Sequence, residues 1–178
     1  MIAACTDVLS PGATVATADL LPLGIQTAPP AGISFWVVNT RATTRALRHN
    51  DGFNTLYAEI QVPSGSLANL NGTPIGPGDS IEVNVTPLAG GYGVTVGPSG
   101  ITFSSAPRVT FSYARYGDAT VADGSSYTSP SAYAAALEVW EEVTVGRWRT
   151  AAGSSSAGTD QITALLDASG RLMVAAPR

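Results

Sequence analysis

The sequence predicts an all-β fold, an antiparallel β-sandwich of about nine or ten short strands, and two observations support this. The chain of 178 residues holds 19 glycines and 12 prolines, spread at short intervals as in folds of short strands and tight turns. Between these residues apolar and polar side chains alternate. The alternation is most regular in residues 80–86, where Ile81, Val83 and Val85 share one face of a strand. Two sheets with such faces bury them against each other.

Segments rich in β-branched and aromatic residues follow one another from residue 33 onward, bounded by Gly, Pro or polar turn residues. We expect strands at residues 33–39, 55–62, 80–86, 92–96, 101–103, 108–113, 137–140, 143–150, 161–166 and 172–175. Only residues 130–137, which include three consecutive alanines, favour a short helix.

Residues 1–32 are rich in Pro, Ala and Thr and keep neither a strand period nor a helix period. We therefore divide the chain into an anchor and extended arm, residues 1–32, and a β-sandwich domain, residues 33–178. Leu20, Leu21, Leu23 and Ile25 make the arm more apolar than a simple linker requires. These four residues are candidate partner contacts, and the alternative is that the arm is a spacer.

The only cysteine of the chain, Cys5, ends the sequence Met1-Ile2-Ala3-Ala4-Cys5. This stretch resembles a bacterial lipobox, in which an apolar residue and two small residues precede a cysteine that becomes acylated. The resemblance implies a lipid anchor at Cys5 and a protein held at a membrane, in the periplasm or on the outer cell surface. The alternative is an ordinary free cysteine.

Three stretches resemble the ZU-type β-sandwich domain of ankyrins, netrin receptors and zonula occludens protein, in the version found in exported bacterial proteins. Residues 60–67 are similar to a strand that ends in a Pro-x-Gly-Ala-Leu turn, and residues 96–113 to the family's Gly-Pro-x-Gly-x-x-Phe and Pro-Val-x-Leu pair. Residues 137–177 are similar to the bacterial tail, with its Gly-x-Trp hairpin and last strand. The resemblance covers residues from about 55 to the end and implies a sandwich in which Trp148 is buried.

The charged residues favour neither nucleic-acid binding nor catalysis. All nine basic residues are Arg, and 13 acidic residues leave a net charge of −4, so no basic patch exists to bind phosphates. The single histidine, His49, lies in the turn-like sequence Arg48-His49-Asn50-Asp51-Gly52, where we expect a solvated side chain. We also expect Glu141 and Glu142 to form a hairpin rim that faces water. No EF-hand spacing or nucleophile elbow is present, and we expect no cofactor, no metal and no enzymatic activity.

Phe35 and Trp36 are neighbours on one predicted strand, so their rings must face opposite sides of a sheet. Arg41, Arg45 and Arg48 follow closely, and these five residues are our main candidates for partner contacts. The sequence thus predicts an interaction module that docks on, or bridges, proteins of a membrane-associated envelope assembly. One version is an accessory periplasmic subunit of an energy-conversion complex such as a photosynthetic reaction centre. The alternative is a surface carbohydrate-binding or adhesive domain that uses exposed aromatic residues.

Overall fold

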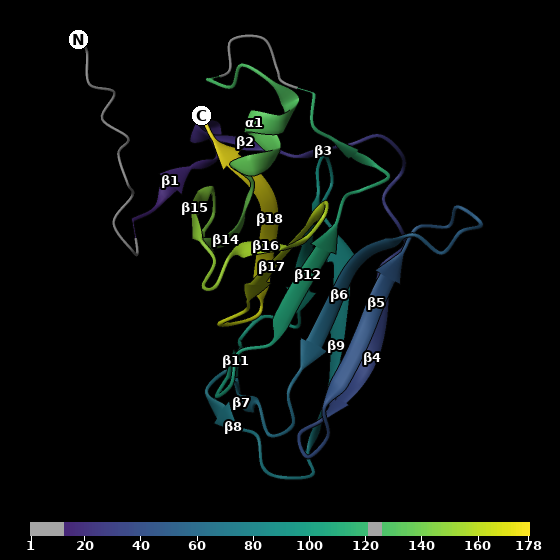
Figure 1. The fold of residues 1–178 in the computed structure, drawn as a ribbon. Helices are drawn as coiled ribbons and strands as arrows, with labels where there is room; N and C mark the ends of the chain where they lie inside the picture. Colours follow the sequence, from purple (N-terminus) through teal and green to yellow (C-terminus); the bar gives the residue numbers. More distant parts are fainter. Residues whose placement is uncertain (1–12, 121–125) are drawn as a thin grey trace.

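The computed structural model describes residues 13–120 and 126–178, so the candidate lipid anchor Cys5 lies outside the described residues. The described chain is nearly all β with antiparallel sheets, which confirms the predicted sandwich-like fold (Figure 1). Its larger sheet has eight strands, in the order β1 (Val15–Ala16), β15 (Arg147–Thr150), β14 (Glu138–Thr144), β18 (Gly170–Pro177), β10 (Gly93–Gly97), β9 (Ser80–Pro87) and β4 (Ile33–Val38), with β2 (Leu20–Pro22) also paired to β18.

The second sheet has five strands, in the order β16 (Ser155–Gly158), β17 (Gln161–Leu165), β12 (Arg108–Ser112), β6 (Leu56–Val62) and β5 (Thr43–Arg48). Two smaller sheets lie at the ends of the sandwich (Figure 1). They are formed by β11 (Ile101–Phe103), β7 (Leu67–Leu70) and β8 (Thr73–Pro74), and by β13 (Gly117–Asp118) and β3 (Gly24–Ile25). The expected number of strands is too low because several of these strands have only two to four residues.

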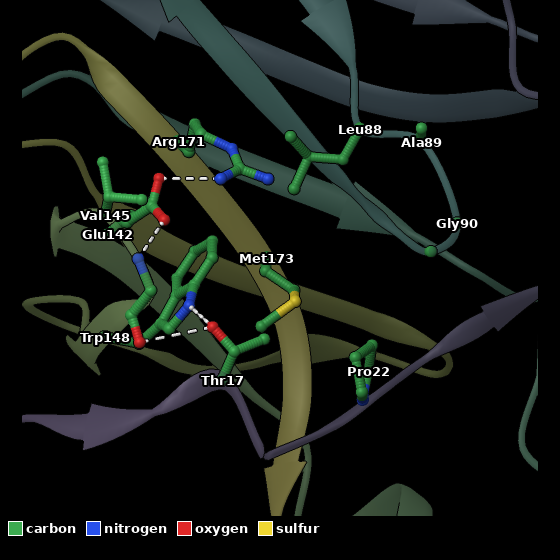
Figure 2. Close-up of a pocket in the computed structure, with 12 residues that line it drawn as sticks. Thr17, Pro22, Leu88, Ala89, Gly90, Glu142, Val145, Trp148, Arg171 and Met173 are labelled. Atoms are coloured by element: carbon green, nitrogen blue, oxygen red, sulfur yellow. Dashed lines mark hydrogen bonds and ion pairs between the residues drawn. The ribbon is translucent and has the colours of Figure 1, made fainter. Parts of the chain in front are cut away.

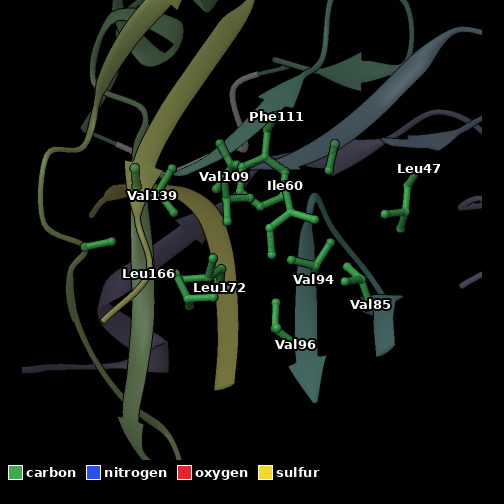
Figure 3. Packing of buried hydrophobic residues seen from close by; sticks show 14 of the residues in the cluster. Leu47, Ile60, Val85, Val94, Val96, Val109, Phe111, Val139, Leu166 and Leu172 are labelled. Carbon is green, nitrogen blue, oxygen red and sulfur yellow. The ribbon is translucent and has the colours of Figure 1, made fainter. Parts of the chain in front are cut away.

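The main core lies between the two large sheets (Figure 3). Ile81, Val83 and Val85 alternate with exposed residues along β9, as predicted, and all three are buried. Tyr57 of β6 ties the two sheets together, because its hydroxyl donates to the Gly93 carbonyl oxygen at 2.8 Å and accepts from the Gly93 amide at 3.0 Å. This pair of bonds satisfies a fully buried phenol.

The N-terminal segment that was predicted as an extended arm or a spacer is folded onto the sandwich over its described residues 13–25. Residues 13–25 form β1, a 3₁₀ turn (Thr17–Asp19), β2 and β3, and each strand pairs with a strand far along the chain. Leu20, Leu21 and Leu23 are at most 7 % exposed. These candidate partner contacts therefore pack against the chain's own strands, and Ile25 in β3 is half-buried.

The predicted helix is present as α1 (Pro130–Ala135), which begins where the Ser129 hydroxyl accepts a hydrogen bond from the Ala132 amide. Its buried Tyr133 donates to the Leu21 carbonyl oxygen at 3.0 Å, which fastens the helix to the arm. No helix of the described residues is both long and apolar enough to cross a membrane.

Candidate partner-binding surface

Strand β4 places two large aromatic side chains on opposite faces of the eight-stranded sheet, as its sequence predicts. Phe35 points into the core and is 7 % exposed, whereas Trp36 points outward and is 61 % exposed. Their neighbours continue the alternation, with Ser34 exposed and Val37 buried. An outward tryptophan with most of its surface in water is unusual, because its ring carries a large apolar area.

The backbone of β4 has one side without a strand partner in the described structure, because β4 ends the order of its sheet. The Asn39 amide donates to the Asp79 carbonyl oxygen at 2.9 Å, in register with the β4–β9 ladder. In an antiparallel ladder every second residue directs its N–H and C=O to the same neighbour. Phe35 and Val37 therefore bond to β9, whereas Ser34 and Trp36 direct their main-chain groups toward the open side.

The next strand, β5, ends the opposite sheet and lies near β4 in Figure 1. This strand and the turn before it carry three exposed arginines. The Arg45 guanidinium lies 5.7 Å from the centre of the Phe35 ring and donates to the carbonyl oxygen of Thr44. Arg48 donates to the Asn54 carbonyl oxygen at 2.8 Å, and Arg41 lies in the turn before β5. Among the described residues no carboxylate forms an ion pair with Arg41, Arg45 or Arg48. We refer to β4 and β5, together with their exposed side chains Trp36, Arg41, Arg45 and Arg48, as the open edge.

The sequence analysis missed an exposed aromatic residue beyond the end of β5. Phe53 is 71 % exposed, and the Arg115 guanidinium lies 4.1 Å from its ring centre. The available signal was a phenylalanine inside the polar turn Asn50-Asp51-Gly52-Phe53-Asn54. An apolar ring in such a turn has no strand or helix to bury it, so exposure is the expected outcome.

His49 corrects a second expectation, since it is only 4 % exposed and not a solvated turn residue. Its ring lies 4.5 Å from that of Tyr116 and 5.4 Å from that of Tyr57, measured between centres. Burial lowers the pKa of His49 from its ordinary 6.5, although the charge of Asp51 and a hydrogen bond with the Ala28 backbone act in the opposite direction. Its Nε2 has no hydrogen-bond partner among the described residues.

Asp51 is held ionised by the turn around it. Its carboxylate accepts from the Thr55 hydroxyl, from the amides of Phe53 and Thr55, and from the Tyr116 hydroxyl at 3.0 Å. The bond from the Thr55 hydroxyl is the main reason that the pKa of Asp51 lies well below its ordinary value. These bonds fix the turn that carries Phe53, so the carboxylate has a structural role here.

The other half of the outer face of the eight-stranded sheet is covered by the arm (Figure 2). Trp148 is buried as expected, and its indole N–H donates to the Thr17 hydroxyl at 2.9 Å. Next to it is a cavity of about 340 Å³ bordered by Leu88, Met173 and Pro22. The second apolar cluster of the molecule lies on this face and consists of Leu20, Leu88, Trp140, Trp148, Met173 and Ala175.

Glu141 and Glu142 do not form a water-facing rim. Glu141 is 9 % exposed and forms an ion pair with Arg149. Glu142 accepts from the Gly146 amide and from Arg171, both at 2.8 Å, at the margin of the cavity (Figure 2). Both carboxylates therefore fasten strands β14, β15 and β18 to one another.

The chain matches no family model and no curated protein.

Proposed function

We propose that the protein is a non-catalytic interaction module that docks on, or bridges, subunits of a membrane-associated assembly of the bacterial envelope, through the open edge of its sandwich. The observation that carries the proposal is the position of Trp36. It stands 61 % exposed on an edge strand, and the edge strand of the opposite sheet, with the turn before it, carries arginines that have no carboxylate partner in the described structure. Trp and Arg are the residues that most often anchor protein interfaces.

The side chains suited to proton transfer support a non-catalytic role. The single histidine is enclosed by aromatic rings, and Asp51, Glu141 and Glu142 are bonded within the fold. A lipid anchor at Cys5, the location in the periplasm or on the cell surface, and the likeness to ZU-type domains remain parts of this proposal. A photosynthetic reaction centre is one assembly of this kind, and the protein would be its accessory periplasmic subunit.

A carbohydrate-binding or adhesive function would use the same tryptophan as a stacking platform. Tyr127 is a second aromatic residue that we considered for this role. It lies beside α1, where its ring packs on Tyr133 and its hydroxyl donates to the Pro177 carbonyl oxygen at 2.7 Å. The two aromatic residues thus belong to different parts of the molecule. Tyr127 therefore does not extend a glycan platform built on Trp36, which favours the protein-docking proposal.

The test is affinity purification of the tagged full chain from detergent-solubilised membranes of its own cells. We expect defined partner proteins to copurify with the original chain, and the Trp36→Ala variant to lose them. Val145→Ser is the matched control, because Val145 is also an apolar residue and is 95 % exposed, but lies on the β14–β15 hairpin, away from β4. Recovery of the chain alone, or partners retained by Trp36→Ala, would contradict the proposal. Membrane fractionation of Cys5→Ser tests the anchor, since an acylated cysteine predicts release of the variant from the membrane.

A further inference from the structure

The four edge strands of the two large sheets differ in how they are protected against pairing with another chain. Natural proteins block such edges with very short strands, bulges, prolines or charged residues. In the described structure, β1 has only two residues, β16 is polar and carries a register shift between Ser156 and Gly158, and β5 carries Arg45 and Arg48. Three of the four edges are thus protected.

Strand β4 has none of these protections. It has six residues, reads Ile-Ser-Phe-Trp-Val-Val, contains no proline or charged residue, and pairs with β9 in one unbroken register. Its free side presents the main-chain groups of Ser34 and Trp36, whose side chains are both exposed. A strand of this kind is a template for a further strand.

We infer that the open edge binds its partner by strand addition: an extended segment of another protein pairs with β4 and continues the eight-stranded sheet. The inference rests on the proposed function and specifies how that surface works. Main-chain hydrogen bonds to Ser34 and Trp36 supply affinity, and alternate side chains of the added strand supply specificity.

The charges on the open edge determine the chemistry of the added segment. Arg45 lies over Phe35 at the gap between the two sheets, Arg41 lies in the turn before β5, and Arg48 is the last residue of β5, all without ion pairs in the described chain. The segment is therefore acidic on the face that it turns toward β5. On its other face an apolar side chain covers the ring of Trp36.

A second copy of the chain fits this edge less well. Pairing β4 with β4 of another copy would bring two identical sets of Arg41, Arg45 and Arg48 to one interface. Like charges placed together at an interface disfavour it, whereas an acidic segment neutralises them. The occupant is accordingly a foreign acidic strand.

The test uses proline to remove one main-chain donor from the open side. Ser34→Pro deletes the N–H that points away from β9, so the ladder to β9 keeps all its bonds, and prolines are tolerated at such edge positions. Ser34→Ala is the matched control, which loses the hydroxyl but keeps the N–H. The probe is a short peptide that alternates valine and aspartate, compared with one that alternates valine and lysine. Binding is measured by fluorescence polarisation, and protection of the Ser34 and Trp36 amides by NMR hydrogen exchange.

We expect the aspartate peptide to bind, to protect both amides, and to bind at least about tenfold more weakly to Ser34→Pro and to Arg45→Glu than to Ser34→Ala. Equal binding of the lysine peptide, or unchanged exchange of the two amides, would overturn strand addition by an acidic segment.

The purification from membranes separates this inference from the proposed function. If Trp36→Ala loses the partners but Ser34→Pro keeps them, the open edge remains the docking surface and strand addition is excluded. Partners kept by both variants would exclude the docking surface as well. If the chain associates with itself and Ser34→Pro abolishes this association, the occupant of the edge is a second copy of the chain and not a foreign strand. Far-UV circular dichroism of each variant checks that it is folded.

Discussion

The outer face of the eight-stranded sheet has two halves that carry the same kind of side chain in opposite environments. On one half, Trp148 is 2 % exposed beneath the N-terminal arm, with its indole N–H bonded to Thr17. On the other half, Trp36 is 61 % exposed, and no described segment of the chain covers it. The chain thus supplies its own cover for the β14–β15–β18 half and leaves the β4 half open.

The covered half shows what a partner would have to provide on the open half. The arm adds β1 and β2 to strand edges, so that main-chain groups are paired. It also lays Leu20 against the two buried tryptophans and brings the Thr17 hydroxyl to the indole of Trp148. Edge pairing combined with an apolar lid is the arrangement that we propose for a foreign strand on β4.

The largest expected effect is the difference in stability between the variant that lacks Trp148 and the variant that lacks Trp36. Trp148→Ala leaves a cavity in the second apolar cluster and should lower the free energy of unfolding by about 3–5 kcal/mol. Trp36→Ala removes a ring that already lies mostly in water and should change it by no more than about 0.5 kcal/mol. Urea unfolding of both variants measures the difference. Comparable losses would mean that the open half is packed in solution and would remove the contrast between the halves.

The open half could be predicted from sequence because its signal is local. Alternation along residues 33–39 predicts that Phe35 and Trp36 face opposite sides of a sheet, and the structure has Phe35 inside and Trp36 outside. The arginines after them are exposed as well, as is usual for this residue type.

On the covered half the burial of Trp148 was expected, but its cover by the arm could not be predicted, because the contacts join residues that are far apart in the chain. Strand β2 has three residues, too few to show a period, and its partners in β18 lie at the other end of the sequence. The expectation for His49 is wrong for the same reason: the residues beside it do form a turn, but the ring that buries it belongs to Tyr116 on another loop. Local chemistry predicts the turn, whereas tertiary packing decides the exposure.

The second prediction concerns His49, which follows β5 and whose side chain is bonded to the Ala28 backbone of the segment that leads from the arm to β4. Its pKa is lowered in the folded state, so the unfolded chain binds the proton more readily as the pH falls below 6.5. Stability should therefore be constant above this value and decline below it, with a slope of at most about 1.4 kcal/mol per pH unit for one proton.

Urea unfolding between pH 7.5 and 5 measures this slope, and His49→Phe, which fills the same aromatic enclosure without a titrating group, should remove it. Asp51 does not interfere, because its lowered pKa makes its own contribution disappear only below the ordinary value of 3.8. An unchanged slope in His49→Phe would assign the pH dependence to other groups.

The smallest expected effect tests the lid over Trp148 without changing its shape. Thr17→Val keeps the volume of the side chain but removes the hydroxyl that accepts the indole N–H at 2.9 Å, which leaves a part-buried donor without its partner. The loss should be about 1 kcal/mol, and Thr17→Ser, which retains the hydroxyl, should lose less. A shift of Trp148 fluorescence in Thr17→Val but not in Thr17→Ser would locate the change at this indole. If both variants equal the original chain, water replaces the hydroxyl, and the arm covers this half of the sheet by strand pairing and apolar contact alone.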